Sequence, residues 1–133
     1  MKKILVVDDD PNIRFLYTQL FSEKGYRVFE AESGKETFDI LKNEEISLVV
    51  LDIKLRLESG LNILQRIVKE FSNIPVVLCT AFASYQDDYT SWLADSYVVK
   101  SGNPYELLTE VNDVLNKRTS VTKEQTEDLT RIP

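Results

Sequence analysis

The chain has 133 residues, of which 43% are hydrophobic, and this is enough apolar material for one domain around one core. Its formal net charge of -6 argues against nucleic acid as a direct ligand, because no basic patch is available to neutralise phosphates. Histidine is absent, which excludes catalysis by serine-histidine or cysteine-histidine pairs. A metal site would need oxygen ligands, so the candidate metals are hard cations such as magnesium, manganese or calcium.

The chain contains one cysteine, Cys79, so an intramolecular disulfide cannot form and we expect a reduced, cytoplasmic setting. Because Cys79 stands inside an apolar run, it should be a small buried hydrophobic side chain. The sequence has no signal peptide and no run of about 18 apolar residues, so we expect no membrane contact by either route.

The first elements expected are a strand over residues 3–7, a helix that begins after Asp10 at Pro11, and a second strand over residues 27–31. Asp10 can cap the free amides of that helix, and Pro11 suits its first position. Gly25 supplies a left-handed stop. Apolar residues spaced along one helical face predict its buried side: Ile13, Leu16, Tyr17, Leu20 and Phe21. Residues 27–31 alternate in polarity, which indicates a half-exposed edge strand.

Two further helices follow in the next forty residues. The capping-box spacing of Ser33 and Glu36 predicts the start of one helix, which should bury Phe38 and Leu41. The other is expected after a charged loop, beginning at Gly60. Its buried face is marked by regularly spaced apolar residues: Leu61, Leu64, Ile67, Val68 and Phe71.

Between these helices, residues 47–52 form an unbroken apolar run that ends in a single carboxylate, Asp52. Such a run is typical of a strand that is buried on both faces. Residues 75–80 form a second run of this kind, which ends in Thr80. Because ligands of open parallel sheets bind outside the carboxyl ends of the strands, Asp52 and Thr80 mark the expected site.

The last part of the chain is less regular. Residues 83–94 have at best a short and weakly patterned helix, and residues 96–100 are expected to be a final short strand. Asn103 and Pro104 repeat the signal of a cap followed by proline and begin the last helix. Its buried face is predicted to contain Leu107, Leu108, Val111, Val114 and Leu115.

Strand and helix therefore alternate five times, and the buried middle strands require a parallel sheet covered on both sides, which is an α/β fold. We expect one domain over residues 1–118. Residues 119–133 are polar and rich in threonine, so they should form a C-terminal tail or the start of a linker.

Three carboxylates should meet at one edge of this sheet, because Asp8 and Asp9 follow the first strand and Asp52 follows the third. At a separation of about 5 Å and an effective dielectric constant near 20, each like-charge pair costs on the order of 3 kcal/mol. Either one carboxylate takes a proton or a divalent cation offsets the repulsion. Lys100 adds a positive charge at this edge and Thr80 adds a hydroxyl, a set that suits phosphoryl transfer to Asp52.

At this point the sequence resembles the response-regulator receiver family, the CheY-like half of two-component signalling that becomes phosphorylated. The resemblance covers residues from about 2 to 118. Its motifs are Val-Val-Asp-Asp at 6–9, Leu-Asp at 51–52, Gly60, Thr-Ala at 80–81 and Tyr-Val-Val-Lys at 97–100. It implies a flavodoxin-like, doubly wound parallel sheet of five βα units with the strand order 2-1-3-4-5.

The resemblance also implies a function. Asp52 would accept a phosphoryl group from a histidine kinase or a phosphotransfer protein, as in a phosphorelay, and would thereby switch contacts with a downstream target protein. The chain would be a signalling domain and no enzyme, apart from magnesium-dependent self-phosphorylation and autodephosphorylation at Asp52.

The implied ligands follow from the matching motifs. Magnesium would be held by four residues: Asp8, Asp9, Asp52 and Lys54, the last through its backbone carbonyl. Thr80 and Lys100 would bind the phosphoryl oxygens, and Tyr97 would change its exposure as Thr80 moves. We also expect the Lys54 ammonium to be drawn toward the carboxylates, to lower magnesium affinity and to prolong the phosphorylated state.

Four positions depart from the family pattern. This chain has Arg56 where the family often has proline and Ser59 where it often has aspartate. It has Ser101 where the family usually has a proline with a cis bond, and Gly102 where an apolar residue is common. A non-proline cis peptide costs about 2.5–4 kcal/mol, so a trans bond is expected after Lys100, which would aim this side chain differently. The span from Thr80 to Lys100 is also shorter than is typical and lacks a customary glycine. The fourth helix of the family is therefore in doubt.

Three hypotheses remain open at this point. The first is a receiver domain switched by phosphorylation of Asp52. The second is a degenerate receiver that acts as a phosphorylation-independent interaction module. The third, an aspartate-dependent phosphatase, is disfavoured because such enzymes place a second aspartate where this chain has Lys54. A cofactor-binding flavodoxin is weaker still, since the loop after the first strand has no Gly, Ser or Thr cluster to cradle a phosphate.

Overall fold

Strands and helices alternate along the chain in the computed structural model, which describes residues 1–100 and 103–117. In chain order the elements are β1 (Lys3–Val7), α1 (Pro11–Glu23), β2 (Arg27–Ala31), α2 (Gly34–Asn43), β3 (Leu48–Leu51), α3 (Gly60–Glu70), β4 (Val76–Thr80), η1 (Ala83–Asp87), η2 (Tyr89–Leu93) and β5 (Ser96–Val99). The labels η1 and η2 denote 3-10 helices, and a last helix covers residues 105–117. Ser101, Gly102 and the tail predicted from residue 119 lie outside the described residues, so the domain boundary stays a prediction.

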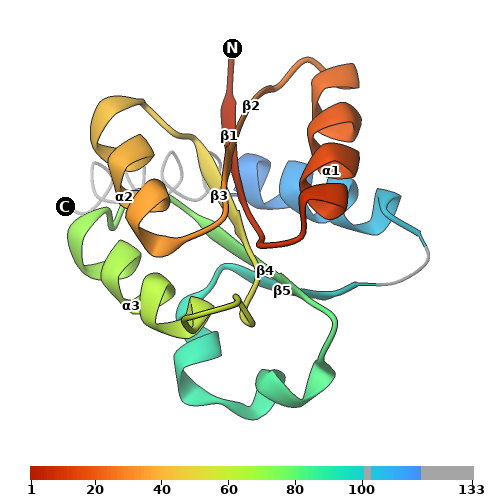
Figure 1. The fold of residues 1–133 in the computed structure, drawn as a ribbon. Helices are drawn as coiled ribbons and strands as arrows, with labels where there is room; N and C mark the ends of the chain where they lie inside the picture. The colour runs from red at the N-terminus through yellow and green to blue at the C-terminus, as the bar shows by residue number, and fades with distance from the viewer. Residues whose placement is uncertain (101–102, 118–133) are drawn as a thin grey trace, which may run out of the picture.

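The five strands form one parallel sheet in the order β2-β1-β3-β4-β5. Helix α1 and the last helix cover one face of this sheet, and α2 and α3 cover the other (Figure 1). The predicted flavodoxin-like, doubly wound fold is therefore confirmed. Strand β2 lies at one edge, where Arg27 and Glu30 are exposed, as its alternating polarity predicted.

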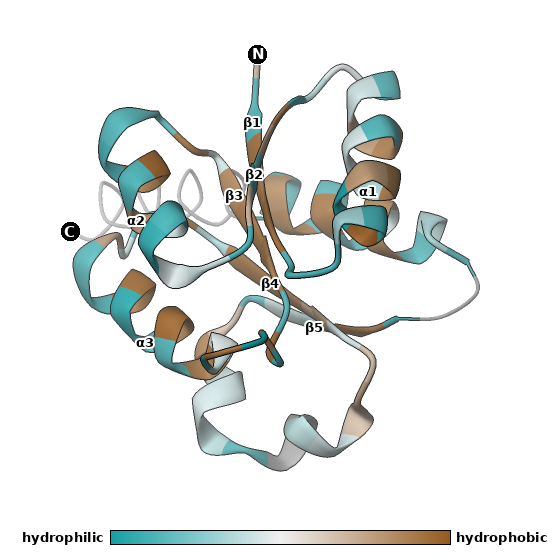
Figure 2. Cartoon of the chain, viewed as in Figure 1, coloured by the Kyte–Doolittle hydropathy of each residue, from teal (hydrophilic) through white to brown (hydrophobic). Residues whose placement is uncertain are grey.

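Strand β1 shows how the sheet supports a core on each face, because successive side chains of a strand point to opposite sides. Leu5 and Val7 pack with buried residues of α2 and α3, whereas Ile4 and Val6 pack with those of α1 and the last helix. Figure 2 shows the hydrophobic sides of the helices turned toward the sheet. All of β3 is buried between β1 and β4, which confirms the predicted central strand.

Polar side chains cap the helices where the sequence predicted their starts. Asp10 accepts a backbone hydrogen bond of 2.9 Å at the start of α1, Ser33 one of 3.2 Å at the start of α2, and Asn103 one of 3.1 Å before the last helix. Gly25, the second residue after α1, has a φ of 90°, the left-handed conformation expected where the helix ends. These local sequence signals thus correctly predicted where three helices begin and where one ends.

One predicted core residue, Leu16, is wrong. Its side chain is 43% exposed, while Tyr17, Leu20 and Phe21 of the same helix are buried. Successive residues of an α-helix are about 100° apart around the axis, which places Leu16 at the outer edge of the stripe formed by Ile13, Tyr17, Leu20 and Phe21. The other apolar residues predicted for the helix faces are buried or half-buried.

Two 3-10 helices, η1 and η2, stand where the sequence left a fourth helix in doubt. Asp88 separates them with extended backbone and accepts a hydrogen bond of 2.8 Å from the backbone N–H of Thr90. The hydroxyl of Ser91 donates to the Tyr85 carbonyl at 2.7 Å and ties the two turns together. Trp92, in η2, is 66% exposed. None of the helices in the described ranges has the length and apolar content that crossing a membrane requires.

Candidate functional site

The carboxyl ends of β1 and β3 bring the predicted carboxylates together. Val7 and Leu51 are partners in the strand register, and the Asp52 N–H donates to the Val7 carbonyl at 2.9 Å, so Asp8 and Asp52 leave the sheet at the same level. One carboxylate oxygen from each of Asp8, Asp9 and Asp52 lies within 4.8 Å of the others. Asp8 is 2% exposed and Asp52 is 7% exposed. This acidic cluster of Asp8, Asp9 and Asp52 therefore carries its charge largely out of water.

Lys100, which follows β5, supplies the nearest positive charge to the acidic cluster. Its Nζ lies 2.7 Å from Asp8 Oδ2 and 3.2 Å from Asp52 Oδ2. Burial raises the pKa of Asp52, and the charge of Asp8 adds to this, although Lys100 opposes both. Burial works to lower the pKa of Lys100, but the hydrogen bond and charge of Asp8 and the charge of Asp52 outweigh it and raise that pKa. Lys100 is thus a charged bridge between the two most buried carboxylates.

The remaining oxygens of these carboxylates face backbone amides. Asp8 Oδ1 accepts from the Asp10 N–H at 2.9 Å, and Asp52 Oδ1 accepts from the Lys54 N–H at 3.4 Å. The donor set of the cluster is made of oxygen atoms alone, which fits a hard divalent cation. A cation held by these carboxylates would lie near the Lys100 ammonium, which contacts Asp8 and Asp52, so repulsion between the two positive charges would oppose its binding.

The loop after Asp52 is closed by backbone contacts. Lys54 and Ser59 form an antiparallel bridge, and the Gly60 N–H donates to the Ile53 carbonyl at 2.6 Å. A Cβ built on Gly60 would overlap the carbonyl oxygen of Asp52 and would lie 2.8 Å from the Cα of Ile53. Position 60 therefore requires glycine because the backbone that carries Asp52 passes directly against it.

Substituting Gly60→Ala is expected to lower the free energy of unfolding by about 3 kcal/mol, because overpacking against backbone atoms cannot be relieved by rotating a side chain. Urea denaturation measures this change. Gly34→Ala is the matched control, since a Cβ there would overlap the carboxylate of Glu58, a flexible side chain that can swing away, and would otherwise make an ordinary contact with Ile63. Equal stabilities for the two variants would show that the loop moves freely from Gly60.

Phe82, two residues after β4, contacts three of the predicted site residues. Thr80 is fully buried, and its hydroxyl accepts from the Phe82 N–H at 3.4 Å. The half-buried Tyr97 donates its hydroxyl to the Phe82 carbonyl at 2.5 Å. The Lys54 ammonium lies 5.0 Å from the centre of the Phe82 ring, a cation–π contact. Within the described parts of the chain no ion pair joins Lys54 to the acidic cluster, so the expectation that its ammonium turns to the carboxylates is wrong for this structure.

The sequence model of the response regulator receiver domain matches residues 4–112, which is most of the chain. The chain belongs to the response-regulator receiver family.

Relatives of this receiver domain include solved structures. The response regulator TrrA of Thermotoga maritima, solved in complex with Mg(2+)-BeF, is 42% identical, with a TM-score of 0.82, over 86% of this chain and 99% of that one. The structure of the histidine kinase ThkA in complex with TrrA matches with 43% identity and a TM-score of 0.80, over 86% of this chain and 99% of that one. A CheY-like receiver domain of Methanospirillum hungatei is 30% identical, with a TM-score of 0.84, over 90% and 98%. The family is one of signalling domains rather than of classical enzymes.

Curated relatives are longer than this chain. The probable transcriptional regulator ycf27 of Porphyra purpurea is 37% identical over 123 residues, which is 91% of this chain and 50% of that protein. Its counterpart in Cyanophora paradoxa is 38% identical over 118 residues, which is 87% and 49%. The chain therefore spans about half the length of the curated relatives it matches, and the output of a whole protein does not follow from this similarity.

Two residues of the receiver site were not predicted from the sequence. Phe82 holds the Lys54 ammonium and the Tyr97 hydroxyl, and Arg14 of α1 donates to the Asp8 carbonyl at 2.5 Å. The position of Phe82 just past a strand end is a weak signal for the first. No sequence signal exists for the second, because its acceptor is a backbone oxygen that only the fold brings near.

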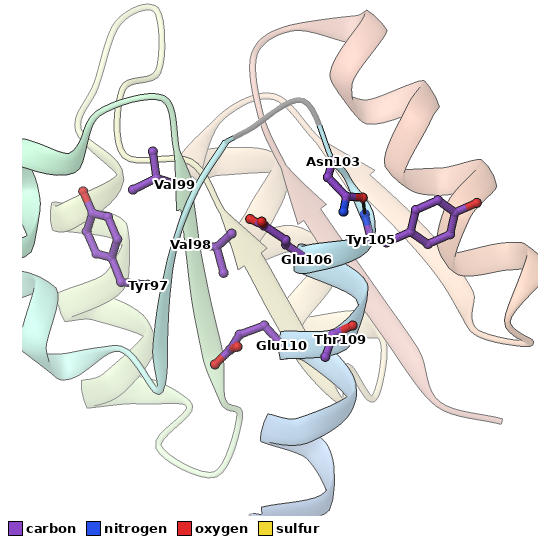
Figure 3. Close-up of a pocket in the computed structure, with 8 residues that line it drawn as sticks. All are labelled: Tyr97, Val98, Val99, Asn103, Tyr105, Glu106, Thr109 and Glu110. Carbon is purple, nitrogen blue, oxygen red and sulfur yellow. Dashed lines mark hydrogen bonds between the residues drawn. The ribbon is translucent and has the colours of Figure 1, made fainter.

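A pocket of about 500 Å³ lies away from the acidic cluster, between β5 and the last helix. Figure 3 shows Glu106 and Glu110 extending from that helix toward β5, with Val98 and Val99 on the strand side. Asp8, Asp9 and Asp52 do not line it. This pocket is therefore separate from the acidic cluster, and its volume is no guide to the position of the candidate site.

Proposed function

We propose that this receiver domain accepts a phosphoryl group on Asp52 from a histidine kinase or a phosphotransfer protein. The observation that carries this proposal is the acidic cluster, whose ligand atoms lie within 4.8 Å of one another at the end of the central strand. Asp8, Asp9 and Asp52 would hold magnesium with the backbone carbonyl of Lys54. Similarity to TrrA, which was solved with Mg(2+)-BeF and with the kinase ThkA, supports both parts.

Phosphoryl transfer forms a bond between one carboxylate oxygen of Asp52 and phosphorus, and breaks the bond from phosphorus to the donor. The chemistry that magnesium supplies when bound is neutralisation of charge on the transferring oxygens. Lys100 adds an ammonium that already contacts Asp52 and could pair with a phosphoryl oxygen. The burial of Asp52 excludes most water from this carboxylate.

The switch that we propose runs through Thr80 and Tyr97. Both residues hydrogen-bond to the Phe82 backbone: the Thr80 hydroxyl accepts from the Phe82 N–H, and the Tyr97 hydroxyl donates to the Phe82 carbonyl. If the Thr80 hydroxyl turned to a phosphoryl oxygen, its bond to Phe82 would break, and Phe82 and Tyr97 would be free to move together. A downstream target protein would read the changed surface, with no direct role for nucleic acid or membrane.

The setting that we propose is the cytoplasm, where a thiol stays reduced. Cys79 is buried, and burial raises the pKa of its thiol to about 11, so the reactive thiolate is scarce near neutral pH. We keep residues 1–118 as the proposed extent of the receiver domain.

Incubation with acetyl phosphate and magnesium tests the proposal, with intact-mass spectrometry as the measurement. We expect a gain of one phosphoryl group, and we expect EDTA to abolish it. A protein that binds magnesium yet gains no mass would favour the second candidate, a phosphorylation-independent interaction module. That candidate has one observation in its favour, the replacement of the family's fourth helix by η1 and η2.

Lys54→Asn tests whether the ammonium that lies over the Phe82 ring affects the site. We expect magnesium to bind about two- to threefold tighter at low ionic strength, a small gain because exposed charges contribute little and are screened by salt. Phosphorylated Asp52 should also decay faster, since an ammonium that can pair with the phosphoryl group and crowd out water is lost. Calorimetric titration and the decay of the phosphorylated mass measure the two effects.

Lys69→Asn, at the far end of α3, makes the same change of charge and serves as the control. Unchanged magnesium affinity and unchanged decay in Lys54→Asn would show that this ammonium stays on the Phe82 ring throughout.

A further inference from the structure

Arg14, in the first turns of α1, connects three parts of the fold behind the acidic cluster. Its Nη1 donates to the backbone carbonyl of Asp8 at 2.5 Å, and its Nε lies 3.3 Å from Glu30 Oε1 on β2. The Arg14 side chain is only 15% exposed, whereas that of Glu30 is 42% exposed. A planar guanidinium can make two such contacts in fixed directions, which a lysine ammonium cannot reproduce.

The carbonyl that Arg14 holds belongs to the peptide bond between Asp8 and Asp9. Because this bond is planar, fixing its carbonyl also fixes the direction in which the Asp9 backbone leaves. The Asp8 N–H is held on the other side by the Ala31 carbonyl of β2, at 3.1 Å. The contacts of Arg14 and Ala31 therefore hold the backbone on both sides of Asp8, from which the Asp8 and Asp9 carboxylates extend.

We propose that Arg14 is a positioning residue for the cation site, acting through the Asp8–Asp9 peptide without touching the cation. This inference rests on the proposed function, because it assumes that the acidic cluster binds magnesium. Replacing a residue that orients a metal ligand without touching the metal typically changes metal affinity by about 10–100-fold.

Electrostatics alone predicts the opposite sign. Arg14 is a positive charge that contacts the backbone of the cation site, so its removal would by charge alone strengthen the binding of a divalent cation. A positioning role predicts weaker binding in spite of the lost charge. Arg14→Gln therefore separates the two effects by sign, and Arg14→Lys, which keeps the charge, isolates the loss of guanidinium geometry.

The experiment is calorimetric titration of the full chain with magnesium chloride, below the melting temperature of every variant. We expect Arg14→Lys to bind magnesium about tenfold more weakly than the wild type. Arg14→Gln should also bind more weakly. Arg66→Lys is the matched control, because Arg66 in α3 pairs with Glu70 of the same helix, lies over the ring of Phe38 in α2 and has no contact with the acidic cluster among the described residues.

Arg14→Lys with wild-type affinity, or Arg14→Gln with tighter binding, would overturn the positioning role while leaving the magnesium site intact. A similar loss in Arg66→Lys would overturn it too, since the effect would then reflect general destabilisation. A wild-type protein that binds no magnesium would instead overturn the proposed function, and the inference with it.

Discussion

Replacing Lys100 with methionine is expected to destabilise the domain by about 3 kcal/mol in the absence of divalent cations. Removing one partner of a buried ion pair typically costs about 3–5 kcal/mol, because the other charge is left without compensation. Here two buried carboxylates, Asp8 and Asp52, would lose the ammonium that bridges them at 2.7 and 3.2 Å. The partial exposure of Lys100 places the expectation at the lower end of this range. Urea denaturation in EDTA is the measurement.

Magnesium and acid should both reduce this loss. Magnesium held by the acidic cluster would supply positive charge that the variant lacks, and a ligand stabilises the folded state by about 2.7 kcal/mol at a concentration of 100 times its Kd. The pKa of Asp52 is raised in the folded protein, so the contribution of Asp52 to stability is fully present below its ordinary pKa of 3.8 and is lost as pH rises through the folded pKa. Without Lys100 the pKa of Asp52 should rise further, so stability should depend more steeply on pH. The stability of Lys100→Met should therefore approach that of the wild type as pH falls.

Lys3→Met is the control for this prediction. Lys3 pairs with Glu44 at 3.0 Å, but both side chains are partly exposed, and such pairs contribute about 0–1 kcal/mol. If Lys100→Met were no less stable than Lys3→Met in EDTA, the bridge between Asp8 and Asp52 would have no energetic role.

Asp9→Asn is expected to weaken magnesium binding by more than about tenfold, because one of the three anionic ligands becomes a neutral amide. The half-buried Asp9 is the most accessible member of the acidic cluster, so its loss should disturb the fold less than loss of Asp8 or Asp52. The same substitution should therefore also abolish most of the rise in melting temperature that magnesium produces in the wild type.

Asp10→Asn provides a matched control with the same change in charge one residue away. Asp10 caps α1 and is not part of the acidic cluster, and asparagine caps a helix about as well as aspartate. Undiminished magnesium affinity in Asp9→Asn, or an equal loss in both variants, would contradict the assignment of Asp9 as a ligand.

The parts of the site that could be predicted from the sequence are those at strand ends. The apolar runs before Asp8 and Asp52 identified buried parallel strands, and a parallel sheet brings their carboxyl ends to one edge whatever the details of packing. Lys100 could be placed there for the same reason. In each case a backbone position was enough to locate the functional group.

The parts that could not be predicted depend on where long side chains end. The ammonium of Lys54 was expected at the carboxylates, but it lies over Phe82, because an aromatic ring stands within its reach. Arg14 reaches a backbone carbonyl that no sequence pattern marks. Leu16 satisfied the helical spacing and is still exposed, since the stripe that faces the sheet is narrower than the apolar pattern.

The phosphoacceptor role of Asp52 is the central claim, and intact-mass analysis of Asp52→Ala beside the wild type tests it most directly. Both proteins would be incubated with acetyl phosphate and magnesium, together with Asp39→Ala, which removes an exposed aspartate of α2 as a control. We expect the wild type and Asp39→Ala to gain one phosphoryl group and Asp52→Ala to gain none. An equal gain of mass in Asp52→Ala would contradict the claim, because the phosphoryl group would then reside on another residue.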